Sequence, residues 1–400
     1  MRPLVLHSVY RYLPLTETWI YGQIQAVTGF RQAVVSIGRE NPERFPFEPI
    51  VSMSDHPLVK PVAAAADWVA KRRGRPLERY DRLLAPWYQF GWPILATTHL
   101  QAWGPRVIHA HFGDQATRTL GLKAATHAPM VTTFYGYDLA LVREPFWRHA
   151  YARLFREGDC FLVEGRAMAR TLSEIGCPPT KIRVQHLGVD VQGIPFTPRE
   201  PESTCRVLIS ASFREKKGIP QALQAYAKVL AKHPGKLTLT VIGDGPMRET
   251  IHGMARDLGL YDSIRWLGYQ PHGVFLEEAR RAHVFLHPSI TASDGDTEGG
   301  APVSLLEAQA TGLPVVATLH ADIPEVTTPG SAELVPERDI EALAAALERV
   351  ALRPERWGVM GLAGRLHVEA EYDAQQQGQR LEAIYHALMQ QHASRRLAFD

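Results

Sequence analysis

Residues 284–317 read VFLHPSITASDGDTEGGAPVSLLEAQATGLPVVA, and this stretch decides the fold class. The apolar run Val284–His287 predicts a buried strand. After a glycine-rich loop, Pro302 suits the first turn of a helix and Gly312 suits its end. The apolar run Val315–Ala317 then predicts a second strand. A strand, a helix and a strand in this order predict a parallel βαβ unit.

The same alternation extends over most of the 400 residues. Several of the short runs are apolar throughout, as expected for strands that helices cover on both faces. A chain of this length exceeds what one hydrophobic core usually serves, so we predict an α/β protein with two Rossmann-like domains and a parallel sheet in each. The other expected strands are Leu4–Val9, Ala33–Ile37, Val107–His111, Met130–Phe134, Cys160–Val163, Ile182–His186, Arg206–Ser210, Leu237–Ile242 and Ile264–Trp266.

The polar stretch Phe196–Thr204 follows Pro195 and contains Pro198 and Pro201. This composition predicts the linker between the two domains. Residues 1–195 are then the first domain, with a helical insertion at about 58–103, and residues 203–371 are the second. Residues 372–400 form a C-terminal segment. Within it, Asp373–Gln391 predicts a helix that covers one of the domains, because four apolar side chains share one face: Leu381, Ile384, Tyr385 and Leu388.

Composition excludes several classes of protein. An apolar fraction of 45% and a charged fraction of 22% argue against disorder, and a net charge of +2 argues against nucleic-acid binding. The three cysteines lack CxxC spacing, which fits a reducing compartment. The sequence lacks a signal-peptide pattern and a long apolar span, so we expect a cytoplasmic protein.

The insertion at 58–103 is rich in aromatic residues and contains the basic cluster Lys71–Arg75. It fits a helical subdomain with a charged turn. It also fits a surface for anionic lipid or a lipid-linked acceptor, because basic and aromatic side chains suit a membrane interface. Both interpretations stay open, and the second would place the protein on the inner face of the cytoplasmic membrane.

The glycine-rich loop before the predicted helix suits a phosphate. Gly299 and Gly300 let an anion approach backbone N–H groups at the positive end of the helix dipole. Glu307, inside the helix, is placed to reach ribose hydroxyls, and Glu298, in the loop, is placed to touch a sugar. These residues together predict a cradle for a sugar nucleotide.

This stretch resembles the Glu-x7-Glu motif of the retaining family-4 glycosyltransferases, which have the GT-B fold. Here Glu298 and Glu307 stand nine positions apart, so the loop carries one extra residue. A second segment, Ser210–Gly218, resembles the family's Gly-Arg-x-x-x-x-Lys-Gly motif, whose Arg and Lys bind the donor diphosphate. Lys217 matches the Lys, and Arg214 is the candidate for the Arg, because Ser212 occupies the usual Arg position.

A third segment resembles the family's Gly-x-Gly-Pro turn. It contains Gly243 and Gly245 at the end of an expected strand. With Gly268 and Tyr269, which follow the next strand, it is expected to line the nucleobase pocket, since ligands of doubly wound sheets bind at the carboxyl ends of strands.

The first half carries weaker resemblances at the family's interdomain cleft. His111 ends one expected strand, and Tyr135 and Asp138 follow the next. Tyr135 stands where the family often has a histidine. The turn containing Glu17 and Thr18 resembles that of exopolysaccharide transferases of the colanic-acid type, and these residues with Thr16 are also expected to cap a helix. His111, Glu17 and Thr18 each fit either a structural role or the acceptor site.

The resemblance implies an active site in the cleft between the domains and transfer of a hexose with retention from a UDP- or GDP-linked sugar to a glycan or lipid-linked oligosaccharide. Glu298, Arg214 and Lys217 would be catalytic, and no cofactor would be needed. Asp294 and Asp296 have the spacing of a metal-binding Asp-x-Asp. We expect no metal, because Arg, Lys and the helix end already serve the diphosphate. A nucleotide-sugar epimerase and a non-catalytic peripheral membrane protein with the same fold remain alternatives.

Overall fold

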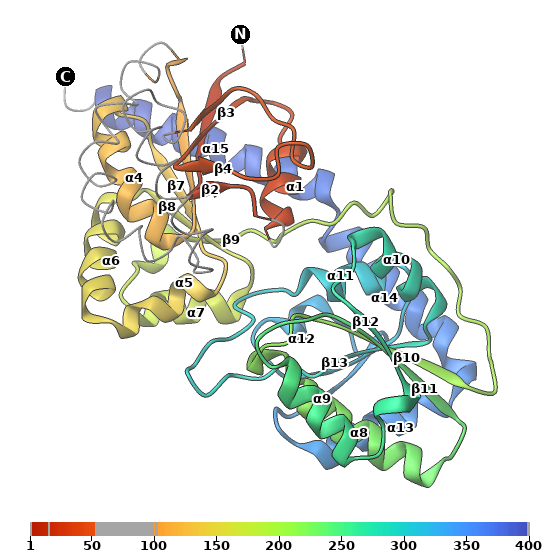
Figure 1. Ribbon diagram of the computed structural model, residues 1–400. Coiled ribbons are helices and arrows are strands. Elements are labelled where there is room, and N and C mark those ends of the chain that lie inside the picture. The colour runs from red at the N-terminus through yellow and green to blue at the C-terminus, as the bar shows by residue number, and fades with distance from the viewer. Residues whose placement is uncertain (1, 15–16, 53–99, 101–102, 398–400) are drawn as a thin grey trace. The chain divides into compact units, whose positions relative to one another are not determined.

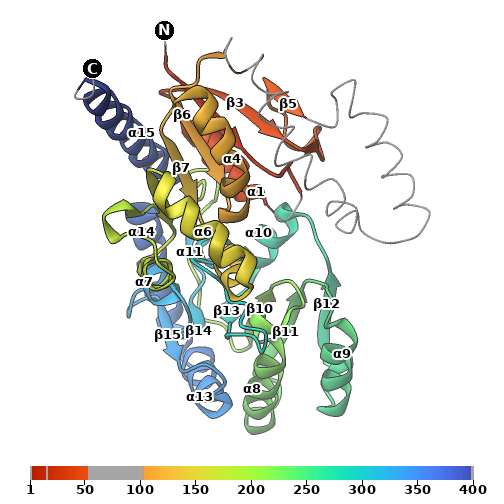
Figure 2. The same cartoon turned by 90° about the vertical axis from the view of Figure 1, so that its left-hand side faces the viewer.

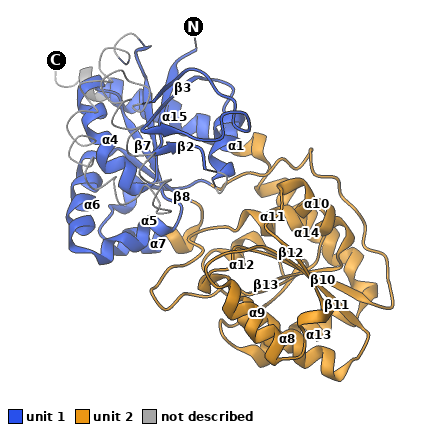
Figure 3. Cartoon of the chain, in the orientation of Figure 1, with its two compact units in different colours: residues 1–163, 169–185, 378–400 blue, residues 164–168, 186–377 orange. Residues whose placement is uncertain are grey.

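The computed structural model describes residues 2–14, 17–52, 100 and 103–397. Its chain divides into two compact units (Figure 3). Unit 1 comprises Met1–Val163, Ala169–Gln185 and Gly378–Asp400, and unit 2 comprises Glu164–Met168 and His186–Gln377. The last segment of the chain thus belongs mainly to unit 1, although it follows unit 2 in sequence.

Unit 1 contains a seven-stranded parallel sheet in the order β5-β3-β1-β6-β7-β8-β9. The central strands β1, β6, β7 and β8 are buried along their whole length, as expected for strands that helices cover on both faces. A parallel pair, β2 and β4, stands beside this sheet. The strands are β1 (Leu4–Ser8), β2 (Arg11–Tyr12), β3 (Arg31–Ser36), β4 (Gly38–Arg39), β5 (Ile50–Ser52), β6 (Val107–His111), β7 (Met130–Thr133), β8 (Cys160–Val163) and β9 (Ile182–Val184).

Helices cover both faces of the unit 1 sheet. On one face, Leu381, Tyr385 and Leu388 of α15 pack against alternate strand residues such as Val5 and Val107. Helices α4 and α6 lie on the other face (Figures 1 and 2). The predicted C-terminal helix and its apolar face are therefore confirmed. The helices are α1 (Thr18–Ala26), α4 (Gly113–Thr126), α5 (Tyr137–Ala140), α6 (Pro145–Glu157), α7 (Arg166–Glu174) and α15 (Ala374–Leu397), with 3-10 turns η2 (Leu141–Arg143) and η3 (Pro179–Lys181); α7 and α15 begin in unit 2.

Unit 2 contains a six-stranded parallel sheet in the order β12-β11-β10-β13-β14-β15. Strand β10 comes first in sequence but lies between β11 and β13, so the strand order reverses there. The strands are β10 (Cys205–Ser210), β11 (Leu237–Ile242), β12 (Ile264–Gly268), β13 (Val284–His287), β14 (Val315–Thr318) and β15 (Ala332–Val335).

Two apolar clusters cover the faces of the unit 2 sheet. Alternate strand residues such as Val207 and Leu239 pack with α8 and α13, and their neighbours, such as Leu208 and Phe285, pack with α10 and α11 (Figure 1). The helices are α8 (Ile219–Lys232), α9 (Arg248–Asp257), α10 (His272–Arg281), α11 (Val303–Ala310), α12 (Ile323–Val326), α13 (Ile340–Ala351) and α14 (Trp357–Glu371), with 3-10 turns η4 (Glu215–Lys217), η5 (Tyr261–Ser263) and η6 (Pro354–Arg356).

All strands predicted from the sequence are present, with bounds that differ by at most two residues. The sequence did not predict β2, β4, β5 or β15, which are short or only partly buried. Pro302 precedes the first turn of α11 as its N-cap instead of lying within it.

The proline-punctuated stretch Phe196–Thr204 belongs to unit 2 and is packed against it. Arg199, which is 5% exposed, donates hydrogen bonds to the Ala279 carbonyl oxygen at 2.8 Å and to Thr311 Oγ1 at 3.1 Å. The stretch predicted to be the interdomain linker is therefore part of unit 2, because the buried Arg199 guanidinium fixes it to α10 and α11.

The predicted insertion at 58–103 lies outside the described residues except for positions 100 and 103. Within the described ranges, the helices are too short or too polar to cross a bilayer.

Candidate functional site

Two residues predicted to act on the donor, Lys217 and Glu298, meet at the carboxyl ends of β10 and β13 in unit 2. These strands are neighbours in the sheet, and the chain leaves them toward helices that cover opposite faces. A position of this kind, where the strand order reverses, is where open α/β sheets bind ligands. The loop after β10 carries Lys217, and the loop after β13 carries Glu298.

Lys217 and Glu298 form an ion pair at this edge. Lys217, at the end of η4, places Nζ 2.5 Å from Glu298 Oε2. The two side chains are 16% and 5% exposed. Burial would raise the pKa of the Glu298 carboxyl, but the Lys217 charge and His287 hold that pKa well below its usual value. Glu298 is therefore a buried anion.

Three residues around Glu298 were not singled out from the sequence. The Ser289 hydroxyl donates to Glu298 Oε1, and His287 Nε2 lies 3.4 Å from the same oxygen. The Glu298 backbone N–H donates to His320 Nε2 at 3.1 Å, so His320 carries its proton on Nδ1, which donates to Glu337 at 2.7 Å. For the two histidines, the sequence offered one signal, which is their position at the end of a strand: His287 ends β13 and His320 follows β14.

The glycine-rich loop packs against a second carboxylate. The backbone N–H of Ala301 donates to Glu164 Oε2 at 2.9 Å. A Cβ atom on Gly300 would lie 2.1 Å from that oxygen, so the loop can pass Glu164 only if this residue lacks a side chain. Gly299 has a φ of +80°, which glycine adopts at little cost. Sequence reasoning missed Glu164, which lies far from the loop in the chain.

Glu307 lies in the second turn of α11, as expected. Its side chain is 13% exposed, and its Oε1 lies 2.7 Å from Nε2 of His272 at the start of α10. His272 itself is exposed. Because His272 is exposed, the Glu307 carboxylate that it contacts can bind hydroxyl groups.

The remaining charged side chains of the two loops have different partners. Lys216 binds Asp296 Oδ1 at 3.1 Å and the Thr297 carbonyl oxygen at 2.8 Å, which joins the two loops. Arg214 is exposed, and no hydrogen bond or ion pair to its guanidinium is found within the described residues. Asp296 is one of the two residues of the alternative metal-binding Asp-x-Asp pair, and its carboxylate binds the Lys216 ammonium group.

The residues predicted to line the nucleobase pocket lie at the ends of β11 and β12. Gly243 has a φ of +146°, and a Cβ there would lie 1.9 Å from the Ala211 carbonyl oxygen, so glycine is required for the close approach of the loop after β10. Gly245 follows in the same turn. Gly268 ends β12, its carbonyl oxygen accepts the Gly243 N–H at 2.9 Å, and Tyr269 is 62% exposed.

The residues predicted for the acceptor side lie in unit 1, and most of them are buried. Asp138 is fully buried, and its carboxylate accepts backbone N–H groups of Gly113 at 2.9 Å, Tyr135 at 3.1 Å and Gly136 at 2.9 Å. Burial raises the pKa of Asp138 to about 7. His111 has no exposed surface, and its Nδ1 lies 2.7 Å from the Tyr135 hydroxyl, which places His111 behind Tyr135 instead of at an open surface.

Glu17 and Thr18 stand at the start of α1. Glu17 is the N-cap residue, but its side chain makes no capping hydrogen bond, and Thr18 is exposed. Burial, with the charges of Asp114 and Glu40, raises the pKa of Glu17 to about 7. Thr16, the expected capping partner, lies outside the described residues.

Family models match both halves of the chain. The model "Glycosyl transferases group 1" matches residues 191–365, and "Glycosyltransferase Family 4" matches residues 34–192. The colanic acid biosynthesis glycosyltransferase WcaL of Salmonella typhimurium is 36% identical over 60% of each chain. The amylovoran biosynthesis glycosyltransferase AmsK of Erwinia amylovora is 32% identical over 70% of each chain, and WcaL of Escherichia coli K12 is 33% identical over 70% of each chain.

Solved structures show the same fold. Sucrose-phosphate synthase of Thermosynechococcus elongatus superposes with a TM-score of 0.75 at 17% identity, over 97% of this chain and 99% of that one. HepE of Anabaena, in complex with UDP and glucose, superposes with a TM-score of 0.71 at 14% identity, over 96% of this chain and all of that one. Two Rossmann-like units, the family models and these relatives together establish that this chain belongs to the family-4 glycosyltransferases of the GT-B fold.

Proposed function

We propose that this glycosyltransferase moves a hexose, with retention and without a metal ion, from a nucleoside diphosphate sugar to a hydroxyl of a glycan or lipid-linked oligosaccharide. Relatives named for colanic acid and amylovoran biosynthesis support a role in cell-surface polysaccharide synthesis. A GDP-mannose-dependent mannosyltransferase of Corynebacterium glutamicum, 28% identical over 66% of this chain and 71% of its own, supports a GDP-linked donor. The complexes of HepE with UDP support a UDP-linked one.

The observation that carries the proposal is the Lys217–Glu298 pair at the carboxyl edge of β10 and β13. An ammonium and a buried carboxylate suit the two ends of a donor, a diphosphate and a sugar. When the donor enters, Lys217 exchanges Glu298 for the diphosphate, and Glu298 becomes available to the sugar. Glu307 then binds the ribose hydroxyls in place of His272, and the turn at Gly243 and the Tyr269 ring receive the base.

The chemistry follows from the charges. The bond between the anomeric carbon and the diphosphate oxygen breaks, and negative charge grows on that oxygen, where Lys217 and Arg214 stabilise it. The acceptor oxygen bonds to the same face of the anomeric carbon, and its proton passes to the departing phosphate oxygen. Glu298, held as an anion, stabilises the positive charge that the sugar ring carries between the two events.

Binding and turnover test the donor site. A thermal-shift screen of UDP, GDP and their hexose conjugates is expected to identify one nucleotide that raises the melting temperature, because a ligand of the native state stabilises it. Lys217→Ala and Glu307→Ala are expected to lose that shift and most of the turnover. The control Lys228→Ala, which removes an ammonium group that pairs with Glu341 away from these loops, should keep both. Wild-type turnover in both donor-site variants would refute the assignment.

Retention and metal independence need separate measurements. The anomeric proton of the product, followed by NMR from the first minutes, is expected to show the configuration of the donor. Activity is expected to survive a chelator, and a loss that magnesium or manganese restores would contradict metal independence. Donor incubated without acceptor should not give an epimer, which separates transfer from epimerisation.

A further inference from the structure

One carboxylate, that of Glu337, holds two separate points of the loop between β13 and α11. Its Oε2 accepts the backbone N–H of Thr291 at 2.8 Å, and its Oε1 lies 2.7 Å from His320 Nδ1. His320 Nε2 in turn accepts the backbone N–H of Glu298 at 3.1 Å. Glu337 follows β15 and His320 follows β14, so the loop that carries Glu298 is tied to two neighbouring strand ends. Neither residue lies in one of the motifs by which the chain resembles the family.

The charge of Glu337 fixes the proton of His320. Burial would raise the pKa of the Glu337 carboxyl, but the Thr291 N–H and His320 hold that pKa below its usual value. A carboxylate only accepts hydrogen bonds, so the proton of His320 is on Nδ1, and a backbone N–H only donates, so Nε2 presents its lone pair to Glu298. The neutral ring thus satisfies both partners, whereas an imidazolium would set an N–H against the Glu298 N–H.

His320 can act on a substrate only through Glu298. It is 1% exposed, so it lies behind the loop and not at a surface. The charged and titratable groups that face the Glu298 carboxylate are Lys217, whose Nζ lies 2.5 Å from Oε2, and His287, whose Nε2 lies 3.4 Å from Oε1. A donor that takes Lys217 removes that partner from the carboxylate but leaves the backbone bond to His320 in place.

Arg338, the residue after Glu337, holds Thr291 from its other side. Its guanidinium donates to the Thr291 carbonyl oxygen and lies 3.8 Å from Glu215 Oε1, which accepts the backbone N–H of Ser293 at 3.0 Å. Arg338 has a φ of +63°, which non-glycine residues seldom adopt. The turn after β15 keeps this conformation where two successive side chains bind Thr291, and strained backbone of this kind often accompanies a functional constraint.

We propose that His320 and Glu337 are positioning residues for the proposed glycosyl transfer. Their hydrogen bonds fix the backbone at Glu298, so that its carboxylate faces the transferred sugar once the donor has taken Lys217. The proposal rests on that function. It predicts a slower chemical step with nucleotide binding retained, because Glu307 and Gly243, the residues proposed for the ribose and the base, are bonded to other groups.

The protonation of His320 can be measured without substrate. In protein labelled with 15N-histidine, the ring that His320→Gln removes from the spectrum is expected to show the neutral Nδ1–H form at about pH 7.5. An Nε2–H form or an imidazolium at this pH would contradict the two hydrogen bonds and overturn the proposal. These spectra do not depend on transfer activity, so the two proposals can fail separately.

Kinetics test the link to the reaction. His320→Leu removes both hydrogen bonds and is expected to lower kcat about 10- to 100-fold with less than about a threefold change in the donor KM, because a small misplacement of a catalytic group slows the chemical step. His320→Gln offers one donor and one acceptor and should return kcat to within about threefold of the wild type. Glu337→Leu should resemble His320→Leu.

A second histidine–glutamate pair of unit 2 supplies the control. His233 Nε2 lies 2.6 Å from Glu348 Oε1, and His233 precedes β11, at the opposite end of the strands from the loop. His233→Leu removes a comparable pair and should keep the wild-type kcat and KM.

Three results would overturn the proposal. The first is a wild-type kcat in His320→Leu. The second is a kcat in His320→Gln as low as in His320→Leu, since the ring and not its hydrogen bonds would then matter. The third is loss, in His320→Leu, of the rise in melting temperature that UDP or GDP gives the wild type, since His320 would then support the whole donor site.

Hydrogen exchange separates the hold on the loop from the proposed transfer. Exchange at residues 289–300 is expected to be faster in His320→Leu than in the wild type and unchanged in His233→Leu, because the Glu298 amide loses its acceptor only in the first variant. This result would show that His320 holds the loop even if the wild type transferred no sugar. Unchanged exchange in His320→Leu would overturn the proposal whatever the activity.

Discussion

Lys217 and Glu298 depend on each other for stability. Both side chains are largely buried, and Glu298 also holds Ser289 and lies near His287. Removing one partner of such a pair leaves a buried charge without its counter-charge, which costs more than the pair itself contributes. Stability and donor binding can therefore be separated at this site by changing one partner or both.

Lys217→Met is expected to destabilise the protein by about 3 kcal/mol, because it leaves Glu298 buried and unpaired. Adding Glu298→Gln should recover most of that loss in a denaturant titration, since the charge is then gone. Neither variant should bind donor. Full stability of Lys217→Met would show that solvent screens Glu298. Donor binding by the double variant would show that neither residue belongs to the donor site.

Glu17 gives unit 1 a pH dependence with a definite sign. Its pKa in the folded protein is raised to about 7, above the unfolded value near 4.3, so the folded state binds the extra proton between these values. Its contribution to stability therefore falls as the pH rises from about 4 to 7. Glu17→Gln, which stays neutral, should gain on the wild type in melting temperature between pH 5 and pH 8. A difference that shrinks with rising pH would contradict the raised pKa.

At the scale of elements, the loop between β13 and α11 is shaped by its contact with Glu164. Before α11 begins, Gly300 passes the Glu164 side chain and the Ala301 backbone N–H binds it. Glu307 follows in the second turn of α11. The loop thus depends on a residue that stands over a hundred positions earlier in the chain.

Gly300→Ala is expected to cost about 1 to 3 kcal/mol of stability, because the new Cβ overlaps Glu164 and overpacks the loop. Glu164→Ala in the same chain should return part of that loss by making room. Gly273→Ala is the matched control, since a Cβ there meets nothing within 4 Å and alanine favours helix α10. Equal effects of the two glycine substitutions would show that Glu164 does not constrain the loop.

The sequence predicted the elements better than the contacts between them. Val107–His111 and Leu237–Ile242 have the bounds of β6 and β11, because short runs rich in apolar and β-branched residues predict strands. The partners of the predicted site residues could not be predicted from the sequence. Ser289, His320 and Glu164 can be placed beside them only when the strand order is known.

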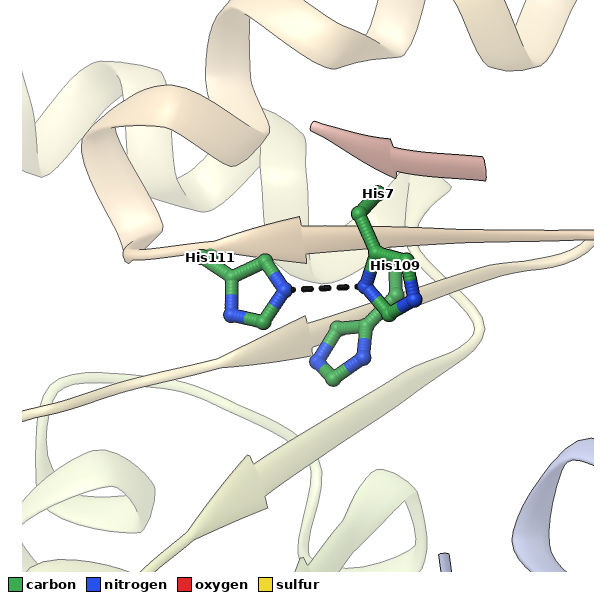
Figure 4. A group of neighbouring side chains, drawn as sticks. All are labelled: His7, His109 and His111. Atoms are coloured by element: carbon green, nitrogen blue, oxygen red, sulfur yellow. Dashed lines mark hydrogen bonds between the residues drawn. The ribbon is translucent and has the colours of Figure 1, made fainter. Parts of the chain in front are cut away.

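Two buried polar side chains show the same limit. Arg199 lies in a proline-rich stretch, but its guanidinium is buried against two helices that are distant in the sequence. His111, for which the sequence left a structural role and an acceptor role open, is buried in the interior of unit 1, where it bonds His7, as Figure 4 shows, and Tyr135. Sequence patterns report local periodicity and miss polar groups whose partners are remote.

At the scale of the whole molecule, the two units have separate apolar cores, and α15 serves the first although it follows the second. The clusters of unit 2 are built from β10 to β15 and their helices, whereas Leu381, Tyr385 and Leu388 pack with the strands of unit 1. Separate cores allow one unit to lose stability while the other keeps its own.

A charge placed in α15 tests this separation. Leu381→Asp puts an unpaired carboxylate into the unit 1 core and is expected to speed hydrogen exchange in β1, β6 and β7. Strands β10 and β11 should stay protected, because the apolar cluster that covers them contains no residue of α15. Ala383→Asp, on the exposed side of the same helix, should leave both patterns as in the wild type. Loss of protection in both sheets at once would mean that the units unfold together, and unchanged exchange in β1 and β6 would mean that the unit 1 core does not depend on α15.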